Sequence, residues 1–155
     1  MRIKTSGIPC HTPISLVKRA VRFYGEYLMG ENLSSKVWVK VRFRSFKKGS
    51  DEYGYCDWEY DNHKARDFVI TLDRKLSQRE TLQALAHEMV HVKQYARGEL
   101  KDLFRPVHMI KWKGEKYKFE DIDYWEQPWE IEAHGREKGL YIKFLNIQAK
   151  SEKQL

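Results

Sequence analysis

The sequence predicts a single α+β domain in which short strands alternate with three helices. Its 155 residues are enough for one hydrophobic core, and the 41% hydrophobic and 14% aromatic content argues against a disordered chain. Helical and strand patterns follow one another along the chain, and no repeat or Pro/Gly/Ser-rich linker divides it. We therefore expect residues 1–155 to form one domain, with residues 148–155 as a frayed tail.

The first half of the chain is expected to form one helix followed by strands. Thr12 precedes a proline and a mixed apolar run, so the first helix is predicted to be capped by Thr12 and to end near Gly30. Residues 37–43 alternate apolar and basic side chains, which is typical of a strand with one wet face. The aromatic segment 53–60 is the expected hairpin partner of that strand, and residues 67–73 are predicted to form a further strand.

The second half of the chain is expected to contain two helices separated by a hairpin. Ser77 and Glu80 match the capping-box pattern, and the helical run that follows them stops at Gly98. A β-hairpin is predicted over residues 107–119, with its turn at a Lys-Gly-Glu sequence. The last helix is predicted over residues 128–147, beginning at a proline. The predicted order of elements is therefore a helix, three strands, a second helix, a β-hairpin and a last helix.

Composition excludes several classes of protein. Two cysteines are too few for a disulfide framework, and no run of about 18 apolar residues is present to cross a membrane. The N-terminus lacks the apolar core of a signal peptide, so we expect a cytoplasmic protein. The formal net charge of +7 is compatible with contact to nucleic acid and is also an ordinary route to solubility.

A metal-binding pattern lies in the helix that the capping box opens. Residues 87–91 read His-Glu-Met-Val-His, an H-E-x-x-H motif. Two histidines four residues apart stand one above the other on a helix, so His87 and His91 can bind the same metal ion. Glu88 is turned about 100° from His87, which places it to accept a proton from a water molecule that zinc activates. The leucine-rich stripe of this helix lies on the side away from the two histidines, which argues against core histidines and favours a metal site, with surface histidines as the alternative.

A catalytic zinc site usually needs a third protein ligand, and four downstream residues are candidates. They are His108, Glu130, Glu132 and His134. Glu130 and Glu132 lie about 200° apart on the last helix, so the two cannot face the same metal. An acid at Glu130 also interacts favourably with the helix dipole, whereas Glu132 precedes the small Ala133, which allows a close approach to the H-E-x-x-H helix. The residues alone leave the choice open.

Three blocks of the sequence resemble a known family. Residues 87–95, 112–114 and 128–133 are similar to the small zincin-like metallopeptidases common in bacteriophage and bacterial genomes, and the likeness covers roughly residues 67–141. The resemblance implies a zincin fold, in which an active-site helix lies beneath a small sheet whose edge strand receives the substrate peptide. That strand is expected at residues 67–72. It also implies a location in the host cytoplasm or with the virion if a phage encodes the protein.

The resemblance implies a zinc metallopeptidase with one Zn²⁺ ion and a protein or peptide substrate. In related gluzincins a Glu followed by a small residue supplies the third ligand, which corresponds to Glu132, and Glu88 would be the general base. Spartan/SprT-like proteases share His-Glu-Met-x-His but use a later histidine, which corresponds to His108. Glu130 and His134 are the remaining alternatives. A tyrosine often stabilises the oxyanion in such enzymes, and the candidates are Tyr117, Tyr124 and Tyr141.

A basic segment, residues 36–48, suggests a second function. Lys40, Arg42 and Arg44 share one face of the predicted strand with Trp38, an arrangement that suits a nucleic-acid backbone. An ordinary solvated strand face whose charges prevent edge aggregation is the alternative interpretation. The competing hypothesis is therefore a nucleic-acid-binding module with a structural or non-catalytic metal site, or a DNA-associated protease similar to the Spartan/SprT-like enzymes.

Overall fold

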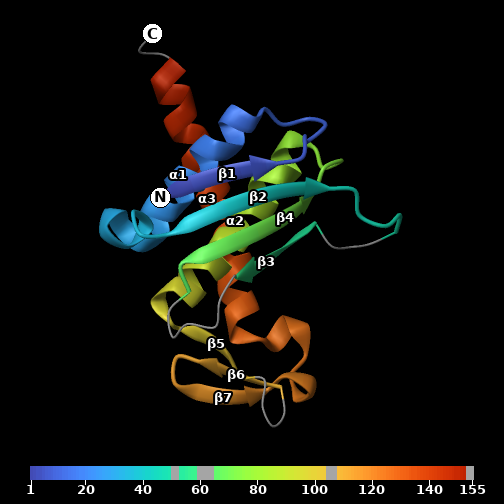
Figure 1. Cartoon of the computed structure of the whole chain (residues 1–155), viewed down its shortest axis with the longest axis vertical. Helices are drawn as coiled ribbons and strands as arrows, with labels where there is room; N and C mark the ends of the chain where they lie inside the picture. The colour runs from blue at the N-terminus through green and yellow to red at the C-terminus, as the bar shows by residue number, and fades with distance from the viewer. Residues whose placement is uncertain (50–52, 59–64, 104–107, 153–155) are drawn as a thin grey trace.

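The computed structural model describes residues 1–49, 53–58, 65–103 and 108–152, which form an α+β fold of three α-helices and two small sheets. The four-stranded sheet lies in front of the helices in Figure 1, and the three-stranded sheet lies at the end of the molecule farthest from the C-terminus. The expected α+β class is therefore confirmed for the described residues. None of the helices described here combines the length and the apolar character needed to cross a membrane.

The first sheet is mixed, with strand order β1-β2-β4-β3. Strands β1 (Arg2–Ser6), β2 (Trp38–Arg44) and β4 (Asp67–Asp73) run parallel, and β3 (Gly54–Trp58) pairs antiparallel with β4 at one edge. The inward side chains of β2 and β4 join the hydrophobic core; they are Val39, Val41, Phe43, Phe68, Ile70 and Leu72. This sheet therefore buries one face against the helices.

Two expectations about this sheet were wrong. Segment 53–60 was expected to pair with strand 37–43, but β3 pairs with β4 instead. Val69 and Thr71 are buried as well as Phe68 and Ile70, as expected for a strand that lies in the centre of the sheet between β2 and β3. Strand β1 was not predicted, because its short alternating pattern does not indicate a strand without the parallel pairing with β2.

The first helix, α1 (Ile14–Ser34), differs from its prediction at both ends. Pro13 occupies the N-cap position without a side-chain hydrogen bond, and Thr12 is buried rather than capping the helix. Gly30 has a φ of +75°, a left-handed conformation that glycine adopts without steric cost, so it kinks the helix instead of ending it. The helix then continues to Ser34.

Helix α2 (Gln78–Arg97) lies at the centre of the molecule and carries the H-E-x-x-H motif. Both halves of the predicted capping box form: Ser77 Oγ accepts from the Glu80 amide, and the Glu80 carboxylate accepts from the Ser77 amide. Gly98 ends the helix in the left-handed conformation, as expected. Because α1, α3 and the first sheet surround α2, almost every side chain from Thr81 to Gln94 is buried.

The second sheet contains the predicted hairpin and one further strand. Strands β6 (Met109–Trp112) and β7 (Glu115–Lys118) form the hairpin, and β5 (Leu100–Leu103) pairs with β6. Residues 113 and 114 form a two-residue turn, and both have positive φ, which is typical of tight hairpins. Residue 107, the expected start of the hairpin, lies outside the described residues.

The last helix, α3 (Pro128–Glu152), starts at the predicted proline and is longer than predicted. Residues 148–152 are helical, so the expectation of a frayed tail is wrong for them, and residues 153–155 lie outside the described part. Ala133, Leu140 and Phe144 are buried in the main core, and Trp129 packs with the second sheet. Helix α3 thus connects the two parts of the fold.

The capping box gives a stability prediction. Ser77→Ala should lower the free energy of unfolding by about 1 kcal/mol at neutral pH, because it removes the side-chain acceptor for the Glu80 amide. Hydrogen bonds from Ser77 lower the pKa of Glu80 in the folded protein, so the contribution of the box is present above the ordinary glutamate pKa and is lost as pH falls through the lowered value. Urea denaturation at neutral and acidic pH measures both effects. Ser45→Ala, at an exposed loop position, is the matched control, and an equal loss in both variants would contradict the assignment.

Candidate metal centre

Three donor atoms from two helices converge on one point. Helix α2 supplies the Nε2 atoms of His87 and His91, which lie 3.1 Å apart, and α3 supplies the carboxylate of Glu130. Its oxygens lie 3.3 Å from His87 Nε2 and 3.4 Å from His91 Nε2. Ligands bonded to zinc at about 2.0–2.1 Å in a tetrahedron are separated by about 3.3 Å. The 3.3 Å distance is to Glu130 Oε2 and the 3.4 Å distance is to Oε1, so the two imidazoles and the carboxylate lie at distances compatible with binding one zinc ion.

The other ring nitrogen of each histidine has its own acceptor. His87 Nδ1 lies 2.9 Å from Glu137 Oε2, and His91 Nδ1 lies 2.9 Å from Gln94 Oε1. A carboxylate and an amide oxygen can only accept, so both Nδ1 atoms carry the proton and donate it. The two Nε2 atoms then face each other and Glu130, and each has a lone pair for a metal ion once it is deprotonated. Acceptors of this kind orient metal-binding histidines in known sites.

The electrostatics of the site favour a positive charge between the rings. Burial by itself lowers the pKa of His87 and His91, but the Glu130 carboxylate and the acids around it raise both pKa values above the ordinary range. Burial raises the pKa of Glu130, and hydrogen bonds from the two histidines outweigh it and lower that pKa. Without a metal, protons on the two histidines balance the Glu130 carboxylate; a divalent cation bound between the two Nε2 atoms and Glu130 would take the place of these protons. The residues present therefore fit a divalent metal ion.

Glu132, the third ligand that the resemblance implies, lies elsewhere. Its Oε1 accepts from Lys93 Nζ at 2.8 Å, and its Oε2 accepts from Gln94 Nε2 at 3.0 Å. Among the groups of potential ligands in the described residues, His87 and His91 are joined by Glu130 and not by Glu132. The structure therefore corrects the sequence-based preference, and Glu132 contacts the site only through Gln94 and His91.

Helix geometry explains this outcome. Ala133 is fully buried at the contact between α3 and α2, as the small side chain suggested. Glu130 and Glu132 flank that contact on opposite sides, because about 200° separates them on the helix. One side of α2 presents the two histidines and the other presents Lys93, so Glu130 meets the imidazoles and Glu132 meets the ammonium group. A small buried residue predicts that the two helices approach each other closely. It does not predict how α3 is rotated about its own axis.

Two residues of the site were missed by sequence reasoning, Glu137 and Gln94. Gln94 lies three residues after His91, one turn along the same helix face. Glu137 follows Glu130 and His134 at the i, i+4, i+7 spacing of one face of α3. Both spacings can be read from the sequence and could have identified Gln94 and Glu137 as neighbours of the site.

The remaining histidine candidates lie beside the site. His134 approaches the His87 ring, with 4.5 Å between ring centroids, and forms a second potential ligand group with His87 and Glu137. His108 lines the same cleft. Its Nε2 lies 3.6 Å from an Asp102 carboxylate oxygen, and its ring stacks on Phe119. It is not part of the ligand groups found in the described residues.

Glu88, the predicted general base, is buried between α2 and β3. Its side chain is 6% exposed, and burial raises its pKa. Gly54 of β3 lies next to this carboxylate: a Cβ there would be 3.6 Å from Glu88 Oε1, an ordinary van der Waals contact. Glycine is needed for the packing of β3 on β4, because the same Cβ would lie 2.5 Å from Leu72 Cδ2 and 2.9 Å from the Thr71 carbonyl oxygen.

The site opens into a cleft of about 1170 Å³ between the two parts of the fold. The described residues that line it belong mainly to β3, α2, the second sheet and the start of α3. Among the described residues the lining contains no Lys or Arg, although the whole chain has 29 of them. It contains six acids: Asp57, Glu80, Glu88, Asp102, Glu130 and Glu137. The cleft is therefore acidic in a basic protein.

Of the three tyrosine candidates, the structure brings only Tyr124 to the metal centre. Its hydroxyl donates to Glu130 Oε2 at 2.9 Å and lies 3.1 Å from His134 Nε2. Tyr117 donates to Glu115 on the second sheet, and Tyr141 packs against the main core. Neither of these two lines the cleft.

The strand beside the cleft is not the one expected. Residues 67–72 were predicted to offer a free edge, but β4 is paired with β2 on one side and β3 on the other. Strand β3 occupies the edge of the sheet and lines the cleft. The expected peptide-binding edge therefore moves from β4 to β3.

Comparison of the chain with protein-family models, with curated proteins and with solved structures gave no match. The function is therefore argued from the site itself.

The geometry predicts which glutamate binds metal. Wild-type protein should bind one Zn²⁺, and Glu130→Gln should weaken zinc affinity by at least 100-fold because it removes a ligand carboxylate. The matched variant Glu132→Gln should weaken it by no more than about tenfold, since Glu132 acts only through Gln94. Competition with a chromophoric chelator measures both affinities. The reverse order of the two variants would reject Glu130 as the ligand.

Proposed function

We propose that this chain is a zinc-dependent metallopeptidase with a zincin-type site. The observation that carries the proposal is the triangle of His87, His91 and Glu130, whose spacing fits zinc and whose rings are oriented by outer acceptors. The group contains three potential protein ligands in the described residues, and catalytic zinc sites keep the fourth position for water or substrate. A structural site would be closed by four protein ligands.

Zinc in this position would supply Lewis-acid polarisation of a carbonyl oxygen and a more acidic water molecule. Glu88 follows His87 directly and faces the cleft, so it is placed to accept a proton from the attacking water and return it to the leaving nitrogen. The raised pKa of this buried carboxyl suits a group that must both take and release a proton near neutral pH.

Tyr124 is the proposed stabiliser of the oxyanion. Its hydroxyl lies against Glu130, next to the point where the three donors converge. Burial and the nearby Glu130 raise its pKa, so the hydroxyl keeps its proton and can donate a hydrogen bond to developing negative charge.

Strand β3 offers a way to hold the substrate. Its outer edge borders the cleft, and an extended peptide can pair with such an edge through backbone hydrogen bonds. The approach of β3 to Glu88 at Gly54 would bring a peptide on that edge next to the general base. A peptide is therefore the substrate that suits this cleft.

The charge of the cleft supports a preference for cationic peptides. In the part of the chain that the structure describes, six acids and no Lys or Arg line the cleft, and bound zinc would neutralise only two of these negative charges. Phosphodiesters and acidic peptides would be repelled by the same charge.

The role of Glu88 gives a direct test. Glu88→Gln should reduce peptide hydrolysis by at least 100-fold, because a neutral amide cannot accept the proton, while zinc content and thermal stability stay near wild type. Turnover of a fluorogenic peptide and metal analysis of the same sample measure this. The control Gln83→Glu changes a lining residue without removing a carboxylate and should keep hydrolysis within a few-fold. Equal turnover in wild type and Glu88→Gln would refute the assigned base.

Substrate charge gives a second test. Extended peptides that carry Lys beside the scissile bond should be cleaved with a kcat/KM at least tenfold above matched peptides that carry Glu, and salt should reduce the difference. Asp102→Asn should reduce this preference, whereas Glu26→Gln, at an exposed position on α1, should leave it unchanged. A preference for the acidic peptides would contradict the proposed substrate class.

A further inference from the structure

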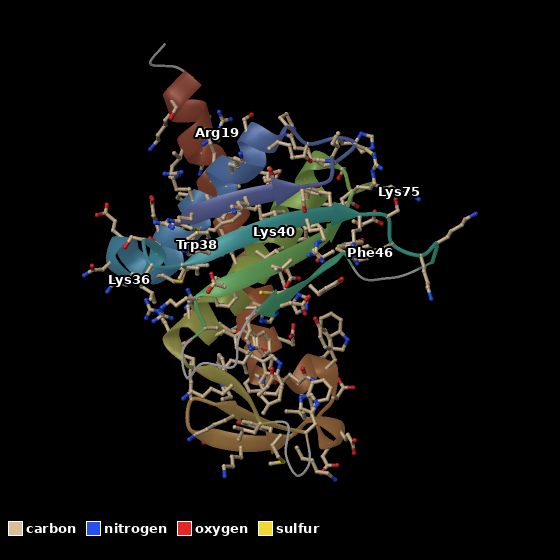
Figure 2. All side chains as sticks on the ribbon, in the orientation of Figure 1. Arg19, Lys36, Trp38, Lys40, Phe46 and Lys75 are labelled. Carbon is tan, nitrogen blue, oxygen red and sulfur yellow. The ribbon has the colours of Figure 1, made fainter. Side chains whose placement is uncertain are left out.

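The outer face of the first sheet is open and basic on its β1–β2 half. Val39, Val41 and Phe43 point into the core, so the alternate residues of β2 point away from the helices. In Figure 2, Trp38 and Lys40 lie along β2 on the side of the sheet turned to the viewer, and no helix crosses that side in Figure 1. This face is therefore accessible to a partner.

Strand pairing adds two cations that the sequence pattern did not reveal. The parallel register places Arg2 of β1 beside Trp38 and Lys4 beside Lys40. Side chains of paired residues point to the same side of a sheet, so β1 extends the basic surface of β2. We call this surface the basic face; it consists of Arg2, Lys4, Trp38, Lys40, Arg42 and Arg44.

The cations of the basic face are not neutralised by acids. None of its five basic residues forms an ion pair with an acid in the part of the chain that the structure describes. The acids of the same side of the sheet, Asp57, Asp67 and Asp73, belong to the β4–β3 half. Positive charge is therefore concentrated on one half of the open sheet.

Trp38 is the aromatic residue within this surface. Its side chain is 39% exposed, and the Arg2 guanidinium lies 4.5 Å from its ring centroid. A cation held over an aromatic ring at a partly exposed position is a combination found where proteins bind single-stranded nucleic acids.

We propose that the basic face binds the phosphate backbone of nucleic acid. Cations recur at every second residue of a strand, about 6.8 Å apart, and they do so on two neighbouring strands. Two lines of unpaired charge suit an extended polyanion better than a single small anion. The face lacks the group of exposed apolar residues with which proteins insert into membranes, so we favour nucleic acid over an anionic lipid surface.

This proposal does not depend on the peptidase proposal. The basic face lies on the outer side of the sheet, and the residues that line the acidic cleft do not include any of its members. The two surfaces have opposite charge, so a nucleic acid is directed to the sheet and kept out of the cleft. A variant can therefore lose peptidase activity and keep nucleic-acid binding, or lose nucleic-acid binding and keep peptidase activity. The failure of one proposal can thus be told apart from the failure of the other.

Fluorescence anisotropy with labelled 20-nucleotide single-stranded and duplex DNA at 50 mM salt tests the proposal. The triple variant Lys4→Gln, Lys40→Gln, Arg44→Gln should bind at least tenfold more weakly than wild type. The slope of log affinity against log salt should fall in magnitude by about 2 to 3, because three phosphate contacts are removed. Comparison of the two DNA forms identifies which one the face prefers.

The matched control removes the same charge from other surfaces. Lys116→Gln, Lys138→Gln, Lys150→Gln changes exposed residues of β7 and α3 and should alter affinity by less than threefold. Circular dichroism melts of both triple variants check that the fold is kept. Equal weakening in both variants would show a non-specific effect of net charge and overturn the proposal. Absence of binding by the wild type at 50 mM salt, or binding to anionic phosphatidylserine vesicles but not to DNA, would overturn it as well.

Discussion

The packing of α3 against α2 is the constraint on which the candidate site depends. Ala133 is fully buried at this contact, so the two helices approach closely enough for side chains from both to meet. The rotation of α3 about its axis then decides which acid reaches the histidines. Glu130 lies against His87 and His91, and Glu132 is held on the other side by Lys93. A larger side chain at position 133 would separate the helices and with them the three donors.

Charge compensation organises the rest of the centre. The histidines donate their Nδ1 protons to Glu137 and Gln94, and Gln94 in turn donates to Glu132. Both Nδ1 atoms thereby have an acceptor, and the Nε2 atoms are left to face Glu130 and a cation. Charge is also unevenly distributed over the described part of the molecule. Acids line the cleft, and cations without an acidic partner lie on the outer face of the first sheet. A protein with a net charge of +7 thus carries two surfaces of opposite sign.

Local patterns predicted the elements that depend on local chemistry. The capping box at Ser77, the left-handed stop at Gly98 and the tight turn of the β6–β7 hairpin all form as expected, because each is decided by a few neighbouring residues. Pairing between distant strands was predicted poorly. Strand β3 pairs with β4 rather than β2, and β1 was missed, because alternation identifies a strand but not its neighbour. Thr12 is buried instead of capping α1 for a similar reason, since tertiary burial outweighs a local preference.

The sequence by itself determined that two histidines and a glutamate would share one helix, because the spacing of residues 87–91 follows from the geometry of a single helix. It also determined that Glu130 and Glu132 could not both face the same metal. Only the tertiary structure decided which of the two lies beside the histidines, which strand borders the cleft, and that Arg2 and Lys4 join the basic residues of β2. The physical reason is that these features depend on how separate elements rotate and pair, and the core packing that controls rotation and pairing involves residues far apart in the chain.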